Sequence, residues 1–146
     1  MSVSAHYEKL ICSSYKLIHD KQAENDVLAG QEAEQEKLLS QEKENLNDLK
    51  RKISGLQSKI YSFLRENGGL FNLNEEQKCF YLSLLDQKGS LSSNLFSSKN
   101  LKYSLSSSIT GLENRQHSNY LTIFNATFDI GDYKNQSNLF SRLETT

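Results

Sequence analysis

The residues of this chain best suited to catalysis or metal binding are three histidines and two cysteines, and their spacing supports neither role. His6, His19 and His117 are far apart, and no carboxylate or cysteine accompanies them at metal-ligand spacing. Cys12 and Cys79 are too few and too isolated for a disulfide framework or a zinc site. We therefore expect surface histidines and free thiols, with no metal and no cofactor.

The serines and glycines carry no catalytic signature either. Serine is abundant between residues 90 and 108 rather than in a G-x-S-x-G turn. Gly68 and Gly69 lack the lysine and the preceding strand of a phosphate loop. We therefore expect a protein that is not an enzyme, and an enzyme with no recognisable motif is the most distant alternative.

The charge distribution argues against strong attraction to nucleic acid or to a membrane. The formal net charge is -1, which gives no reason for non-specific binding to either. Acidic residues predominate from residue 20 to 48, and basic residues from 50 to 65 lack the interleaved aromatics of a nucleic-acid surface. We interpret both as solvated helix surfaces, with an acidic docking strip as the alternative. Since there is neither an 18-residue apolar run nor a recognisable signal peptide, we expect a cytoplasmic protein without membrane insertion. Export by an apparatus that reads a folded helix stays open.

A single heptad register fits residues 7 to 63 and predicts one long helix over residues 1–66. The chain contains no proline, as long uninterrupted helices require. Its narrow apolar seam needs a second helix to cover it. Position a is held by Ile11, Ile18, Leu39, Leu46, Ile53 and Ile60, and position d by Tyr7, Leu28, Leu49, Leu56 and Phe63.

The middle of this helix is its weak part. Between residues 21 and 35 most seam positions are polar, and Gly30 lies beside them. A glycine costs about 1 kcal/mol relative to alanine in a helix, and polar seam residues contribute no apolar burial. We expect a bend or local fraying near residue 30.

A Gly-rich turn over residues 67–74 separates this helix from a second arm. Gly68 or Gly69 can adopt the left-handed conformation that ends a helix. Asn74 is a good N-cap for the next helix, with Gln77 at the reciprocal position of a capping box.

The second arm, residues 75–130, has its own seam and a serine-rich middle. Serine is a mediocre helix former, so we expect a less stable helix with a break around Ser97 to Asn100, and a serine-rich linker is the alternative. Phe80, Leu85 and Tyr103 widen the seam. The seam residues are Tyr81, Leu84, Leu91, Leu95, Leu105, Ile109 and Leu112.

Residues 117–131 fit two patterns. Tyr120, Phe124 and Phe128 recur at i, i+4 as in a helix, whereas the segment from Phe124 to Ile130 alternates as in a strand. We favour the helix because a strand needs partners and no second convincing strand is present. Gly131 and Asp132 should end the element, which leaves residues 131–146 as a polar tail.

Two arrangements could cover the seams: an antiparallel hairpin within the chain, or a parallel dimer of the first helix. A parallel dimer brings g residues against e residues of the other helix, and none of the pairs in this register is a complementary ion pair. We therefore favour the hairpin. The pairs are Leu38 with Lys43, Asn45 with Lys50, Lys52 with Gln57, and Lys59 with Leu64.

Together these patterns predict a mostly α-helical protein, a long antiparallel helical hairpin or coiled coil with a C-terminal segment of uncertain type. One hairpin leaves part of its seams uncovered, so we expect a non-catalytic interaction protein, an adaptor or chaperone-like accessory subunit. A helical partner or self-association would complete the seam. The alternative is a structural coiled-coil subunit of a larger complex with a C-terminal docking module. The expected partner-binding residues are Leu39, Leu46, Leu49, Ile53, Leu56, Ile60, Phe63, Tyr120, Phe124 and Phe128.

This plan resembles that of small accessory or chaperone-like proteins of bacterial secretion machines. The small secreted hairpins of type VII systems carry a W-x-G turn, whereas this chain has no tryptophan. Its turn reads Asn67-Gly68-Gly69-Leu70-Phe71. The resemblance is therefore one of plan and not of motif.

Overall fold

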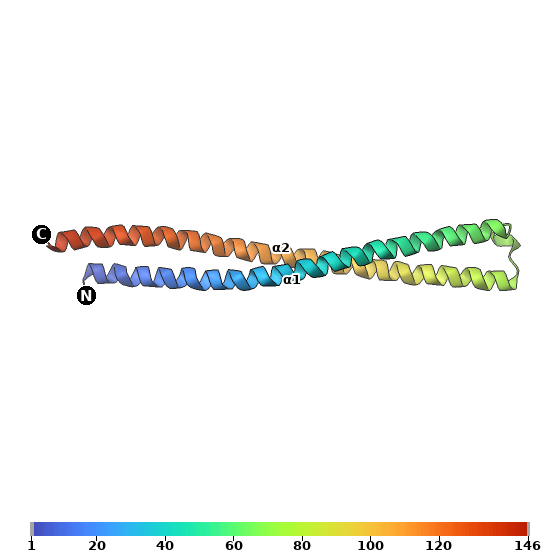
Figure 1. The fold of residues 1–146 in the computed structure, drawn as a ribbon, viewed down its shortest axis with the longest axis horizontal. Helices are drawn as coiled ribbons and strands as arrows, with labels where there is room; N and C mark the ends of the chain where they lie inside the picture. The colour runs from blue at the N-terminus through green and yellow to red at the C-terminus, as the bar shows by residue number, and fades with distance from the viewer. Residues whose placement is uncertain (1, 146) are drawn as a thin grey trace. The chain divides into compact units, whose positions relative to one another are not determined.

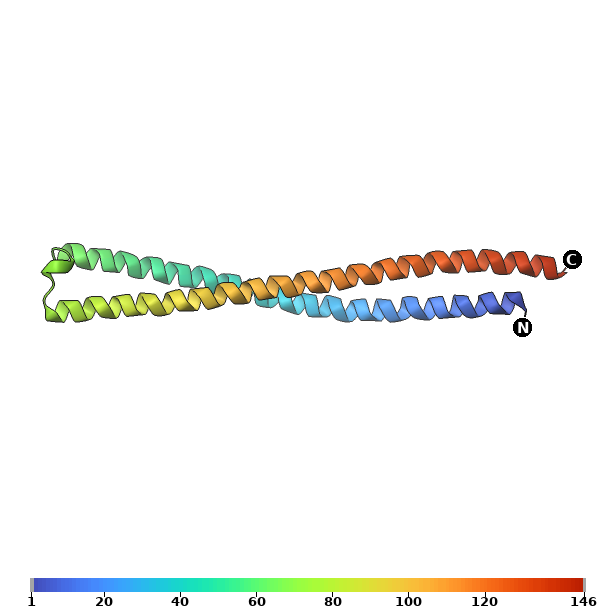
Figure 2. The ribbon, with the colours of Figure 1, turned by 180° about the vertical axis from the view of Figure 1, so that it is seen from behind.

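The computed structural model describes residues 2–145, which form two long helices joined by a short turn. Helix α1 spans Val3–Glu66, the 3-10 helix η1 spans Leu70–Asn72, and helix α2 spans Glu75–Thr145. The described residues contain no strand. The predicted antiparallel helical hairpin is confirmed, as the opposite directions of α1 and α2 show in Figures 1 and 2.

The chain divides into two compact units, and each unit contains a segment of both helices. Unit 1 comprises residues 1–34 and 108–146, of which residues 2–34 and 108–145 are described, and unit 2 comprises residues 35–107. In unit 1, Ser4 lies against Ser137 and Asn25 against Asn119. Because the α2 number falls as the α1 number rises, the two helices of this unit are antiparallel.

The most buried residues of α1 occupy positions a and d of the predicted heptad register. Leu28 of unit 1 and Leu46, Leu49 and Ile60 of unit 2 are all less than a tenth exposed. In α2 the same spacing holds, and each seam residue expected from the sequence is buried or half-buried. The three residues expected to widen the seam are exposed instead: Tyr103 by 76%, Phe80 by 44% and Leu85 by 37%. The most buried apolar residues of α2 are Leu84, Leu105, Ile109, Leu112, Ala126 and Ile130.

The turn combines two capping motifs. The backbone N–H of Gly69 donates to Leu64 O at 2.8 Å and that of Gly68 to Arg65 O at 3.4 Å, the pattern of a Schellman motif. Gly68 and Gly69 have φ of 78° and 96°, a region that disfavours residues with a Cβ.

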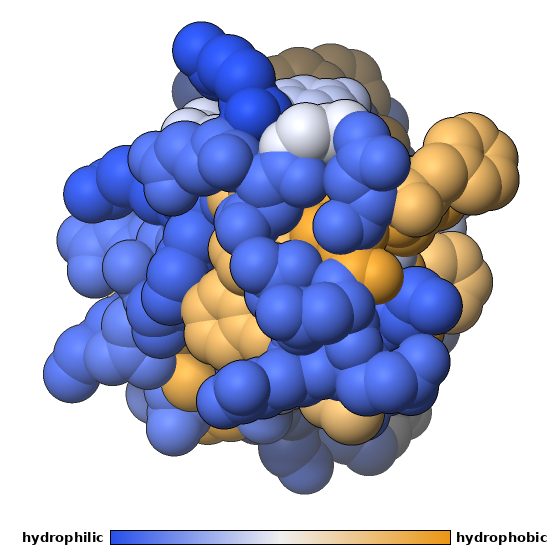
Figure 3. Space-filling view, turned by 90° about the vertical axis from the view of Figure 1, so that its right-hand side faces the viewer, coloured by the Kyte–Doolittle hydropathy of each residue, from blue (hydrophilic) through white to orange (hydrophobic). Residues whose placement is uncertain are grey.

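Seen from the turn, the surface is mostly hydrophilic with separate hydrophobic side chains between the polar ones (Figure 3).

The predicted start of the second helix is confirmed in detail. The backbone N–H of Gln77 donates to Asn74 Oδ1 at 2.8 Å, and the backbone N–H of Asn74 donates to Gln77 Oε1 at 2.9 Å. This reciprocal pair is a capping box. The side-chain amide of Gln77 also donates to Asn67 Oδ1 at 2.7 Å, which joins the end of α1 to the start of α2. The turn therefore fixes the register between the two helices in unit 2.

The two expected breaks in α2 were wrong, because α2 continues through Ser97 to Asn100 and through Gly131 and Asp132. Helix α1 also continues through Gly30, so the fraying expected there is absent, while the alternative of a bend stays a prediction. Each interruption was inferred from weak helix propensity, which costs at most about 1 kcal/mol per residue and is readily offset by packing of the seam. Residues 117–131 are helical, and the segment after them is helix up to Thr145.

Candidate functional site

Seven of the ten residues expected to bind a partner lie in the seam between α1 and α2 of unit 2. Leu46, Leu49 and Ile60 are buried there, and the other four are half-buried. Phe63 packs against Phe80 of α2 with ring centroids 5.0 Å apart. These side chains are thus covered largely by the chain itself, and partner binding through them stays a prediction that requires the seam to open. The half-buried residues are Leu39, Ile53, Leu56 and Phe63.

The other three expected residues form an exposed apolar surface on α2 in unit 1. Tyr120, Phe124 and Phe128 are 61%, 69% and 72% exposed, and Leu121 beside them is 52% exposed. Their spacing of three or four residues places them on one side of the helix. We call these four residues the outer stripe. No Asp, Glu, Lys or Arg occurs from residue 116 to 128, so the stripe lies in an uncharged stretch of α2.

A layer of amides crosses the seam of unit 1 a short distance from the outer stripe. The side-chain amide of Asn119 donates to Asn25 Oδ1 at 2.8 Å, and that of Asn25 donates to the backbone oxygen of Gln116 at 3.3 Å. Asn25 and Asn119 are 7% and 5% exposed. Gln116 in turn donates to Glu32 Oε2 at 2.6 Å. Since buried amides must pair, this layer favours one alignment of α1 on α2.

Two neighbouring residues stabilise the negative charge of Glu24, which lies beside this layer. A hydrogen bond from Asn119 and, second, the positive charge of Lys21 lower the pKa of Glu24 below its ordinary value. Lys21 Nζ lies 3.4 Å from Glu24 Oε2. The carboxylate form of Glu24 is therefore favoured in the folded protein. This polar group positions the helices and offers no nucleophile.

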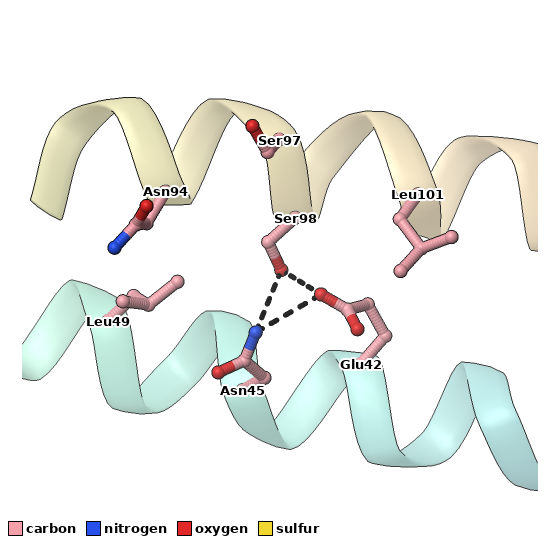
Figure 4. Close-up of a pocket in the computed structure, with 7 residues that line it drawn as sticks. All are labelled: Glu42, Asn45, Leu49, Asn94, Ser97, Ser98 and Leu101. Carbon is pink, nitrogen blue, oxygen red and sulfur yellow. Dashed lines mark hydrogen bonds between the residues drawn. The ribbon is translucent and has the colours of Figure 1, made fainter. Parts of the chain in front are cut away.

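A second polar group interrupts the seam of unit 2 (Figure 4). The hydroxyl of Ser98, which is 4% exposed, donates to the Glu42 carboxylate. The amide of Asn45 donates to the same carboxylate at 3.2 Å and approaches Ser98 Oγ at 3.5 Å. These residues border an open depression of ≈ 380 Å³. Its seven lining residues include no histidine, so the Ser98 hydroxyl has no general base other than the carboxylate that already accepts its proton.

Sequence reasoning missed a group of lysines in unit 2. Lys50 of α1 and Lys99 and Lys102 of α2 border a depression of ≈ 340 Å³ together with Tyr103. Lys50 is distant in sequence from the other two, and only the register of the hairpin reveals their proximity. The three lysines form a basic surface at the edge of the seam, where Lys102 is half-buried.

Sequence reasoning also missed an aromatic cluster in unit 1, because it assigned residues 131–146 to a tail. Tyr7 stacks on Phe140 at a centroid distance of 5.9 Å and lies 6.1 Å from Tyr133. Lys134 Nζ donates to the Tyr15 hydroxyl at 3.0 Å. The heptad spacing of Tyr133 and Phe140 with Ala126 was the available signal. These contacts secure the last turns of α2 on the first turns of α1.

The residues best suited to chemistry do not assemble in the structure. His6, His19 and His117 are exposed on the helices. Cys12 and Cys79 are free and exposed. The predicted free thiols are thus confirmed. Because no catalytic group forms from these residues, the candidate site is the exposed outer stripe.

Comparison with protein-family models, with curated proteins and with solved structures finds no match to this chain. Within the described residues, neither helix has an apolar stretch long enough to cross a membrane.

Proposed function

We propose that this chain is a non-catalytic helical interaction protein, an adaptor or chaperone-like accessory subunit, which binds a helical partner through its outer stripe. The observation that carries the proposal is the exposure of Tyr120, Leu121, Phe124 and Phe128 on one uncharged side of α2. Contiguous exposed apolar side chains on a soluble surface commonly mark an interaction site.

The spacing of the outer stripe favours a helix as its partner. Anchors at i, i+3, i+4 and i+7 are the pattern by which one amphipathic helix packs on another. Leu121, Phe124 and Phe128 follow this pattern, and Tyr120 precedes Phe124 by one turn. The seam between α1 and α2 is already occupied in both units, so a partner bound to the stripe need not open the hairpin.

The narrower parts of this proposal concern cellular context. Membership of a secretion machine is supported only by the hairpin plan. A cytoplasmic location is supported by the two free, exposed thiols, since cytosolic proteins keep their cysteines reduced. The interaction role does not depend on either part.

The test compares partners retained by three tagged baits in an extract of the native source: the wild type, Phe124→Glu/Phe128→Glu, and Phe96→Glu. Phe96 is a matched control because it is 68% exposed on the same helix but lies in unit 2, away from the stripe. Covering a phenylalanine contributes about 1.5–3 kcal/mol, so the double variant should weaken binding roughly 100-fold or more.

The proposal is supported if a helical protein, or a second copy of the chain, is retained by the wild type and by Phe96→Glu but lost by the double variant. Binding should then be reproduced with the purified partner. A set of retained proteins that is the same for all three baits would contradict the proposal.

A further inference from the structure

Three lysines from the two helices of unit 2 border one depression of ≈ 340 Å³. Lys50 belongs to α1, and Lys99 and Lys102 belong to α2. Among the residues that the structure describes, none of these three lysines forms an ion pair. The other lining residues, none of them acidic, are Leu46, Tyr103 and Ser106.

The antiparallel pairing of α1 and α2 explains why these lysines meet. Lys50 is at position e of α1, in the register that places Leu46 at position a. With Lys102 at position a of α2, Lys99 is also at position e. In an antiparallel pair the two e rows flank the same side of the seam, so Lys50 and Lys99 lie on that side together. The lysines are attached to helices and not to loops, so their backbones are fixed within unit 2.

The carboxylates of α1 nearest to this group in sequence do not neutralise it. Asp48 pairs with Lys52 at 3.1 Å, and Glu42 accepts a hydrogen bond from Ser98. Glu44 is at position f, on the side of α1 opposite to the seam. From residue 87 to 107, α2 contains no Asp or Glu.

Unit 2 is positively charged although the chain is not. It contains eleven Lys and Arg against eight Asp and Glu, whereas the whole chain has a net charge of -1. Like charges that border one depression repel each other, and a bound anion replaces this repulsion with attraction. The lysine group therefore favours an anion as the occupant of the depression.

We propose that this depression binds a phosphate-bearing small anion through Lys50, Lys99 and Lys102. Lysine binds phosphate as a point charge and donates charge-assisted hydrogen bonds to its oxygens. The volume of ≈ 340 Å³ lies within the range of small-molecule pockets, about 300–1,000 Å³. Tyr103, whose ring is 76% exposed, offers a face on which the base of a nucleotide can stack. The site lies in unit 2, so it is independent of the outer stripe in unit 1.

A small anion suits the site better than a nucleic-acid strand. A single strand requires a positively charged groove that continues along several nucleotides. Here the three lysines gather at one depression of a chain whose net charge is -1. Nucleotides and inorganic polyphosphate present the same phosphate chemistry, so they are separated by experiment.

The test is isothermal titration calorimetry of the full chain with inorganic triphosphate in magnesium-free buffer. The wild type should bind one triphosphate with a dissociation constant on the order of 0.1–1 mM, because exposed charge pairs are individually weak. Raising the salt from about 20 to 200 mM should weaken binding several-fold, since salt screens exposed charges. Lys50→Gln, Lys99→Gln and Lys102→Gln should each weaken it about three- to fivefold, and the triple variant should show no binding.

Lys88→Gln is the matched control for Lys102→Gln. Lys88 is at position a of α2, as Lys102 is, and both are half-buried, but Lys88 does not border the depression. Lys88→Gln should bind triphosphate like the wild type, and far-ultraviolet circular dichroism should be the same for both variants. Equal weakening by the two substitutions would overturn the inference, and so would a wild type that binds no triphosphate at about 5 mM.

A second titration, with ATP, distinguishes the two sources of phosphate. If the ligand is a nucleotide, ATP should bind about five- to tenfold more tightly than triphosphate, and Tyr103→Leu should remove this difference. Equal affinities would identify inorganic polyphosphate as the ligand. A single-stranded DNA of about 12 nucleotides that binds more than about 100-fold more tightly than ATP would overturn the small anion in favour of a nucleic-acid surface. Failure of this inference leaves the proposed function unchanged, because the outer stripe contains none of these residues.

Discussion

Replacement of Leu84 by alanine should test whether the seam of unit 2 holds the hairpin closed. Leu84 is 1% exposed, the smallest exposure among the buried apolar residues of the described chain. Truncation of a buried leucine to alanine costs about 2–5 kcal/mol. We expect roughly 2–3 kcal/mol, because a seam between two helices surrounds a side chain with fewer neighbours than a globular core.

The same helix offers a matched control two residues earlier. Leu82 is 61% exposed, and Leu82→Ala makes the same change in helix propensity as Leu84→Ala. An exposed substitution of this kind usually changes stability by less than about 0.5 kcal/mol. The two variants lose the same atoms and change helix propensity equally, so a difference in their stability reports the burial of Leu84.

The assay is urea denaturation followed by circular dichroism at 222 nm. Leu84→Ala should lower the denaturation midpoint without changing the slope, while Leu82→Ala should leave both unchanged. In thermal unfolding the difference should be on the order of 5 to 10 °C. Equal effects of the two variants would refute the assignment of Leu84 to a closed seam, and a changed slope in Leu84→Ala alone would indicate that the hairpin does not unfold as one transition.

Three further predictions concern the polar group of unit 1 and the thiols. Asn119→Ala should cost about 1–3 kcal/mol in urea denaturation, because it leaves the buried amide of Asn25 without its donor; no change would show that the layer is not formed. In the Glu24→Gln variant, the free energy of unfolding should fall less steeply than in the wild type as the pH is lowered into the acidic range. The lowered pKa of Glu24 stabilises the fold above the ordinary value of 4.5, and this contribution is lost as pH falls through the lowered value; an unchanged acid limb would refute it. Cys12 and Cys79 should both react with a maleimide without prior reduction, as counted by mass spectrometry, and a thiol that reacts only after denaturation would contradict its exposed position.

Much of the fold could be predicted because one physical signal, the heptad register, extends through α1. The positions of Leu46 and Ile60 in that register are the positions buried in the structure. The turn was equally predictable, since Gly68 at positive φ and the capping box of Asn74 with Gln77 follow from local chemistry.

The expected breaks in α2 share one cause: residues of weak helix propensity were counted as interruptions. Ser98 occupies a seam position of α2 and pairs there with Glu42, so the register continues through it. The end expected at Gly131 was wrong because Tyr133 and Phe140 continue the same register beyond it. Propensity of single residues was thus given more weight than packing of the whole seam.

The candidate site was only partly predictable for a related reason. Apolar residues at helical spacing show which side chains need cover, but they do not show which of them another part of the same chain covers. Seven of the expected residues, among them Leu49 and Ile53, lie in the seam, whereas Phe124 and Phe128 lie outside it. The pairing of α1 with α2 makes that distinction.

Site-directed photo-crosslinking in the native source tests most directly whether the outer stripe is the interaction surface. A benzophenone amino acid would replace Phe124 in one variant and Phe96 in another, two positions of nearly equal exposure at 69% and 68%. We expect a discrete cross-link to a helical protein or to a second copy from position 124, and none from position 96. Cross-links of equal yield from both positions, or none from position 124, would contradict it.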